Sequence, residues 1–200
     1  MTLFISLRRF LFCLCLLLPT SMAQSATVLV LGDSLSAAYG MTEDQGWVHI
    51  LSQTLPQHEW INASASGETS GGGLRRLPNI LDHHNPDVVF IELGGNDGLR
   101  GFPIKKLKAN LEQMIQLSQQ SGAQVMLSEV MIPGNYGPRY TSQFTNVYQE
   151  LAEDYSITLV PFFMRDIAID PNLMLPDGIH PNPDAQPKIA EFLRPWFESI

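Results

Sequence analysis

Five short apolar segments alternate along this chain with longer stretches of helical periodicity, and this alternation is the strongest constraint on the fold. Residues 27–31 (TVLVL) form a β-branched apolar run ending at Gly32, which is typical of a strand buried on both faces. Similar strand segments cover residues 59–63, 87–93, 124–130 and 158–160. Amphipathic helical patterns cover residues 46–55, 73–84, 104–120, 140–155 and 182–200. The pattern predicts an α/β sandwich around a central parallel sheet.

The last helical segment is the least regular of the five. Asn182 followed by Pro183 is a good N-cap and first helical position. Pro187 and Pro195 then interrupt the pattern, so we expect this helix to start late, to kink or to end early.

Ser34 lies directly after the first predicted strand, in the sequence GDSLS. Ligands of parallel α/β sheets bind outside the carboxyl ends of the strands, so reactive side chains are expected at this point. The serine would lie near the start of the following helix, where unpaired backbone N–H groups favour negative charge. It could act there as a nucleophile or simply cap the helix. A serine hydroxyl needs a neighbouring base to become a nucleophile.

His180 is the best candidate for that base among five histidines. The other four, in helical, turn or helix-end settings, have ordinary structural explanations: His49, His58, His83 and His84. Asp177 precedes His180 by three residues with Gly178 between, so its carboxylate can fold back onto the ring Nδ1–H and leave Nε2 free to accept a proton. An Asp-turn carrying a surface histidine is the alternative interpretation.

Two glycine-containing loops are candidates for binding the oxyanion that forms during acyl transfer. Gly67 follows the second strand and offers an unobstructed backbone N–H, and Asn96 follows the third strand and offers two side-chain N–H groups. Each loop alone is typical of an ordinary turn. Their placement on the same edge of the sheet as Ser34 is the stronger argument for a shared function.

The N-terminal segment predicts a secretory signal peptide over residues 1–23, followed by a single domain over residues 24–200. Arg8 and Arg9 precede a nine-residue apolar run, and small residues follow it, so cleavage is expected after Ala23 and as late as residue 26. The run is shorter than the roughly 20 residues of a membrane span, so we expect no stable membrane insertion rather than a retained anchor. Both cysteines lie inside the run, which leaves the mature chain without disulfides, thiolate ligands or a cysteine nucleophile.

The charge of the mature chain disfavours nucleic acid as a partner. Removal of Arg8 and Arg9 leaves ten basic against twenty acidic side chains, a net charge of −10. Such a surface repels phosphate backbones, and no basic stripe offsets it.

The chain closely resembles the SGNH (GDSL) hydrolase family. The motif blocks appear in order: residues 32–36 (GDSLS), Gly67, residues 94–97 (GGND) and residues 177–181 (DGIHP). Intervening segments, such as GGNDGLRGF at 94–102, resemble the bacterial periplasmic esterases described as thioesterase, lysophospholipase and arylesterase.

The resemblance implies a flavodoxin-like five-stranded sheet of order 2-1-3-4-5 and a serine hydrolase that needs no metal or organic cofactor. It implies Ser34 as nucleophile, His180 as base and then acid, and Asp177 as the residue that orients His180. The oxyanion would lie between the Ser34 N–H, the Gly67 N–H and the Asn96 side chain. Asp33 also fits the family pattern, but its spacing alone assigns it no catalytic role.

The expected substrates are small acyl esters and thioesters, namely aryl esters, acyl-CoA and lysophospholipids, cleaved by a monomer in the periplasm. Four apolar or aromatic residues are expected to line an acyl pocket: Ile132, Pro133, Tyr136 and Phe162. Two alternatives remain open: a carbohydrate O-acetyl esterase with a smaller, more polar pocket, and a binding module that keeps the sheet without a working nucleophile.

Overall fold

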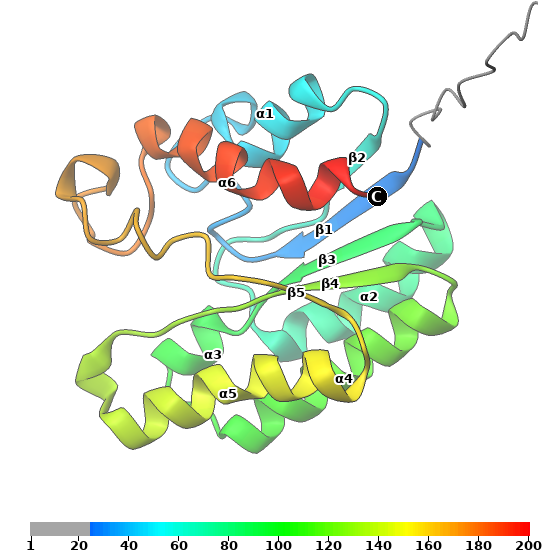
Figure 1. The fold of residues 1–200 in the computed structure, drawn as a ribbon. Coiled ribbons are helices and arrows are strands. Elements are labelled where there is room, and N and C mark those ends of the chain that lie inside the picture. Colours follow the sequence, from blue (N-terminus) through cyan, green and yellow to red (C-terminus); the bar gives the residue numbers. More distant parts are fainter. Residues whose placement is uncertain (1–24) are drawn as a thin grey trace, which may run out of the picture.

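The computed structural model describes residues 25–200, so the expected signal peptide at residues 1–23 lies outside the described residues. Five parallel strands form one sheet in the order β2-β1-β3-β4-β5 (Figure 1). They are β1 (Thr27–Gly32), β2 (Glu59–Asn62), β3 (Val88–Glu92), β4 (Gln124–Ser128) and β5 (Thr158–Val160). The expected fold class and strand order are confirmed.

Helices cover both faces of the sheet (Figure 1). On one face lie α1 (Trp47–Thr54) and α6 (Gln186–Glu198), and on the other lie α2 (Ser70–His84), α4 (Ile104–Gln120) and α5 (Pro138–Asp154). The alternation along β1 explains why both faces are covered. Val28 and Val30 are buried in the core beneath α1 and α6, whereas Leu29 and Leu31 are buried in the core beneath α2, α4 and α5. A strand that is apolar at every position needs a helical layer on each side.

The proline-containing C-terminal helix starts late, as expected. A 3₁₀ turn (Pro183–Ala185), capped by the Asn182 side chain, precedes α6. Pro187 occupies the first turn of α6, where a missing N–H costs no intrahelical bond, and Pro195 lies inside the helix. Within residues 25–200, no helix has both the length and the apolar character needed to cross a membrane.

The strand order fixes where a ligand can bind. From β1 the chain goes to β2 on one side and returns to place β3 on the other, so the direction of winding changes between β1 and β3. Loops leaving the carboxyl ends of these two strands therefore diverge, and the crevice between them is the expected binding position. Ser34 and Asn96 follow these two strands.

Candidate active site

Ser34 lies in a series of turns, residues 34–40, rather than at a helix start, because α1 begins only at Trp47. The expectation of a helix terminus at Ser34, and with it the capping role, is therefore wrong. The Asp33 carboxylate accepts a hydrogen bond from the Leu35 N–H at 3.0 Å, and the Asp33 carbonyl accepts one from the Ala37 N–H at 3.0 Å. Gly32 is required before this turn, since a Cβ there would lie 2.7 Å from the Ser36 Oγ.

Two hydrogen bonds join Ser34, His180 and Asp177. The His180 Nε2 lies 2.9 Å from the Ser34 Oγ, and the His180 Nδ1 lies 2.7 Å from the Asp177 Oδ2. A carboxylate acceptor at Nδ1 favours the tautomer in which Nε2 is unprotonated and accepts the serine proton. The arrangement can therefore remove a proton from Ser34 and stabilise the imidazolium that results.

The segment carrying Asp177 and His180 is held by its own backbone hydrogen bonds. Leu175 N–H donates to the His180 carbonyl at 2.8 Å, and Met174 and Pro181 form an antiparallel bridge. The other Asp177 oxygen accepts from the Ile179 and His180 N–H groups, at 2.9 and 3.0 Å. These contacts, the His180 N–H foremost, lower the pKa of Asp177 to about 2, so it stays ionised as an orienting carboxylate should.

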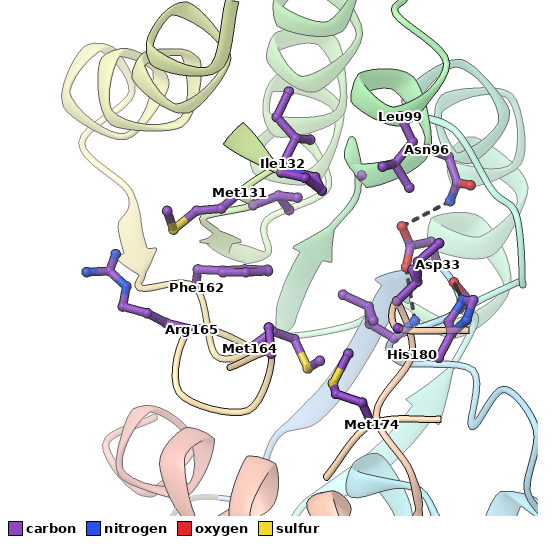
Figure 2. A pocket seen from close by; sticks show the side chains of 18 of the residues that line it. Asp33, Asn96, Leu99, Met131, Ile132, Phe162, Met164, Arg165, Met174 and His180 are labelled. Carbon is purple, nitrogen blue, oxygen red and sulfur yellow. Dashed lines mark hydrogen bonds between the residues drawn. The ribbon is translucent and has the colours of Figure 1, made fainter. Parts of the chain in front are cut away.

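Asn96 lies in a one-turn helix, α3 (Gly95–Leu99), which the sequence suggested was only a turn. Its Nδ2 donates a hydrogen bond to the Asp33 Oδ2 at 3.1 Å, so the residue before the serine orients the amide (Figure 2). Gly94 has φ of 121°, and a Cβ there would lie 2.1 Å from the Tyr148 hydroxyl. Only glycine therefore lets the chain turn from β3 into α3 at this point.

Gly67 lies in the loop after β2, which two contacts hold to the rest of the site. The Ala65 N–H donates to the Gly32 carbonyl at 3.1 Å, and the Arg100 guanidinium donates to the Gly67 carbonyl at 3.2 Å. The buried Asp97 carboxylate accepts from the Ser70 N–H and hydroxyl at 2.8 and 2.6 Å, which joins α3 to the start of α2. The structure thus brings the Gly67 loop and the Asn96 turn together, although Gly67 does not line the cavity described next.

A cavity of about 620 Å³ opens beside Ser34, Asn96 and His180 (Figure 2). Its lining is mostly apolar, and it includes three of the four residues expected from the sequence: Ile132, Pro133 and Phe162. Tyr136, the fourth, does not line it, which corrects that part of the expectation. The Tyr136 hydroxyl donates to the Leu99 carbonyl at 2.8 Å, so the ring is engaged outside the cavity.

Several lining residues were not predicted from the sequence. They include Met164, Arg165, Ile169, Met174 and Ile179. Most come from the irregular segment between β5 and α6, where no strand or helix periodicity indicates which side chains face inward. Two of them have one available signal in the sequence, since Ile179 lies within the Asp177–His180 motif and Met174 lies three residues before it.

Two buried carboxyl groups lie behind the serine turn. Glu92 Oε2 accepts a hydrogen bond from the Ser36 hydroxyl at 2.7 Å and one from the Asp33 N–H at 3.2 Å. Glu92 Oε1 has no hydrogen-bond partner among the residues that the structure describes. Burial raises the pKa of Asp33 from 3.8 to about 6. Burial, with the charge of Asp33 second, raises the pKa of Glu92 well above its ordinary value. Within residues 25–200, no group of three or more His, Cys, Asp or Glu could hold a metal ion.

Glu92→Gln should stabilise the protein increasingly as the pH rises. A raised folded-state pKa means that the contribution of Glu92 to stability is complete below about pH 4.5, the ordinary value, and is lost as the pH rises through the folded-state pKa. Glutamine has no such loss, so the difference in stability between variant and native protein should grow by up to about 1.4 kcal/mol per pH unit between the ordinary and the folded-state pKa of Glu92, and stay constant above the latter. Thermal unfolding of the variant and the native protein at pH 4, 6 and 8 measures this difference in stability.

The exposed Glu191 on α6 provides the control, and Glu191→Gln should shift the melting temperature equally at all three pH values. A melting-temperature difference between Glu92→Gln and the native protein that stays constant from pH 4 to 8 would show that Glu92 is not held protonated.

Comparison with known proteins identifies the family of this chain. Residues 30–186 match the model of the GDSL-like lipase/acylhydrolase family. The chain is 49% identical to an arylesterase of Vibrio mimicus over 84% of this chain and 86% of that protein. It is 46% identical to esterase TesA of Pseudomonas aeruginosa, covering 94% and 96% of the two chains.

A third relative is thioesterase 1/protease 1/lysophospholipase L1 of Escherichia coli K12, 43% identical over 88% of this chain and 86% of that protein. Among solved structures, the psychrotrophic esterase EstA of Pseudoalteromonas sp. superposes with a TM-score of 0.84 at 47% identity, covering 86% of this chain and 97% of that one. The family model spans most of the chain and the identities extend over nearly all of it, so this chain belongs to the GDSL-like lipase/acylhydrolase (SGNH hydrolase) family.

Proposed function

We propose that this chain hydrolyses carboxylic esters and thioesters through an acyl-enzyme on Ser34. The observation that carries the proposal is the hydrogen-bonded line of Ser34, His180 and Asp177, with contacts of 2.9 and 2.7 Å, at the edge of an apolar cavity. The Ser34 Oγ attacks the acyl carbon while its proton passes to the His180 Nε2. His180 then returns that proton to the leaving alcohol, phenol or thiol.

The second half of the reaction uses the same groups. Water enters as the leaving group departs, His180 removes one of its protons, and the resulting hydroxide attacks the acyl carbon. Collapse of this second intermediate breaks the bond between the acyl carbon and the Ser34 Oγ. The Ser34 Oγ takes the proton back from His180, and the carboxylic acid leaves. The tetrahedral intermediate of each half carries an oxyanion, which we assign to the Ser34 N–H, the Gly67 N–H and the Asn96 amide. One Asn96 N–H is already donated to Asp33, and we assign the second N–H of the same amide to the oxyanion.

We assign the cavity to the acyl chain of the substrate. Most of its lining is apolar, and methionines contribute several of the side chains, at positions 131, 164 and 174. Unbranched, polarisable methionines adapt to a flexible chain better than to a rigid sugar. The names of the relatives, an arylesterase and a thioesterase/lysophospholipase, suggest aryl esters, acyl-CoA and lysophospholipids as substrates. An apolar lining disfavours the alternative, a carbohydrate O-acetyl esterase.

The specificity constant should rise with acyl length on p-nitrophenyl esters from two to ten carbons. Each methylene buried in the cavity contributes about 0.8 kcal/mol, so kcat/KM should increase up to about fourfold per methylene until the cavity is filled. Acyl-CoA and lysophospholipid of the best length should be hydrolysed by the same sample. A profile flat from two to ten carbons would contradict the acyl assignment, and activity only on acetylated sugars would favour the O-acetyl esterase.

We also propose that residues 1–23 direct the chain out of the cytoplasm and that residues 24–200 act as one monomeric domain in the periplasm. The basic start, nine-residue apolar run and small residues support this assignment. Intact mass of the exported protein identifies the cleaved bond. A first residue outside 24–27 would contradict the proposed cleavage range.

A further inference from the structure

The aromatic ring of Tyr39 stacks on the imidazole of His180. The two ring centroids are 4.0 Å apart and the ring planes differ by 28°. Tyr39 remains 44% exposed, so it contributes little to the core and its burial does not explain its position. The stack instead covers part of a histidine whose side chain is only 15% exposed.

The backbone that carries Tyr39 is held in an uncommon conformation. Ala38, directly before it, has φ of 54°, in the left-handed region that costs a residue with a Cβ free energy. The turn also lies against the segment that carries His180, because a Cβ on Gly40 would lie 2.9 Å from the Leu175 side chain. Such a conformation persists only where surrounding contacts fix it. The serine turn and the histidine segment are therefore packed together, with the Tyr39 ring between solvent and His180.

The hydrogen bonds of His180 leave one motion of its ring unrestrained. Asp177 and Ser34 bind the two ring nitrogens at 2.7 and 2.9 Å. The N–H and the nitrogen lone pair of an imidazole both lie in the ring plane, so hydrogen bonds to them act in that plane. Both contacts restrain the ring along one line and allow it to tilt about that line. A flat ring stacked on its face opposes this tilt, and its π-face also attracts the positive charge that His180 gains on taking a proton.

We propose that Tyr39 is a positioning residue that holds the His180 imidazole for the second half of the reaction, deacylation. This inference rests on the proposed function. Once Ser34 carries the acyl group, its oxygen is esterified and has no proton to donate to the His180 Nε2. The imidazole then loses the hydrogen bond donated by Ser34 and keeps the Asp177 contact and the Tyr39 stack while it activates water. During acylation the Ser34 contact is still present, so the loss of Tyr39 should slow deacylation more than acylation.

The test compares Tyr39→Leu, which removes the ring face, with Tyr39→Phe, which keeps it. The rate at which a p-nitrophenyl phosphonate labels Ser34 measures the attack of the serine oxygen. The kcat on a p-nitrophenyl ester reports deacylation. The lifetime of acyl-Ser34, followed by quenching and intact mass, measures deacylation directly. We expect Tyr39→Leu to lower the deacylation rate about 3- to 20-fold, consistent with a partly desolvated ring–cation contact. The labelling rate should fall less than threefold, and Tyr39→Phe should retain both rates within about twofold.

The outcomes separate this inference from the function on which it rests. Equal deacylation rates for Tyr39→Leu and Tyr39→Phe, or equal losses in labelling and deacylation, would overturn the positioning role while the native protein still labels at Ser34. A native protein that hydrolyses esters without any label or acyl group on Ser34 would instead refute the proposed function, and the role of Tyr39 with it. Melting temperatures of both variants should match the native value, because the ring is largely outside the core.

Discussion

Ser34→Ala should lower kcat/KM for aryl esters by about 10³-fold or more while the protein remains folded. The serine oxygen is the only group we assign to form a bond with the substrate, so its loss leaves the oxyanion donors and binding cavity without a nucleophile. Ser34 is partly exposed in a turn, and within residues 25–200 its hydroxyl hydrogen-bonds to His180 alone, so truncation removes no core packing. Steady-state kinetics on the p-nitrophenyl ester of best chain length measures the loss of activity, and thermal unfolding measures whether the variant remains folded.

The exposed serine Ser142 on α5 provides the matched control, because Ser142→Ala changes the same chemical group outside the site. It should retain full activity. A phosphonate probe should add its mass to Ser34 in the native protein and in Ser142→Ala, and not to Ser34→Ala. Near-normal turnover by a folded Ser34→Ala protein would refute the proposed mechanism, and absence of labelling in the native protein would support the alternative of a silent binding module.

The sheet was predictable because its strands are encoded locally. Segments such as 27–31 and 87–93 are apolar at almost every position, and this identifies a doubly buried strand without knowledge of any partner. The parallel arrangement then places the carboxyl ends of all strands at one edge. Because Ser34 and Asn96 each follow a strand, this arrangement predicts that both lie at that edge of the sheet. The strand order itself came from the family resemblance, since periodicity does not encode which strands are neighbours.

The parts that were missed depend on contacts between segments far apart in the chain. Residues 95–99 (GNDGL) have the composition of a turn, but Asp97 is buried against Ser70 and the segment closes as a helical turn. Tyr39 has no sequence signal, because its role depends on a stack with His180. Spacing along the chain indicates no role for Asp33, because its contact with Asn96 depends on β1 and β3 being adjacent in the sheet.

The hydrogen bond between Asn96 and Asp33 is the reason why we expect Asn96 to be an effective oxyanion donor. An amide side chain free to rotate would present an N–H to the substrate only part of the time, and catalytic donors act best when they need no reorganisation. Asp33 accepts one Asn96 N–H at 3.1 Å, and α3 fixes the backbone from which the side chain projects. The amide is therefore held in place before substrate binds.

Asn96→Ala should lower kcat on the order of 10²–10³-fold with little change in KM, because negative charge develops on the carbonyl oxygen only in the transition state. Asn146→Ala, at an exposed position on α5, is the matched control and should retain the native rate. The test measures kcat and KM on one short aryl ester, together with the rate of phosphonate labelling of Ser34.

Labelling of Asn96→Ala should be slower than that of the native protein but not abolished, since the Ser34, His180 and Asp177 hydrogen bonds remain. A variant with full kcat would show that the oxyanion is bound elsewhere. A rise in KM at unchanged kcat would mean that Asn96 binds the ground state of the substrate and the transition state equally.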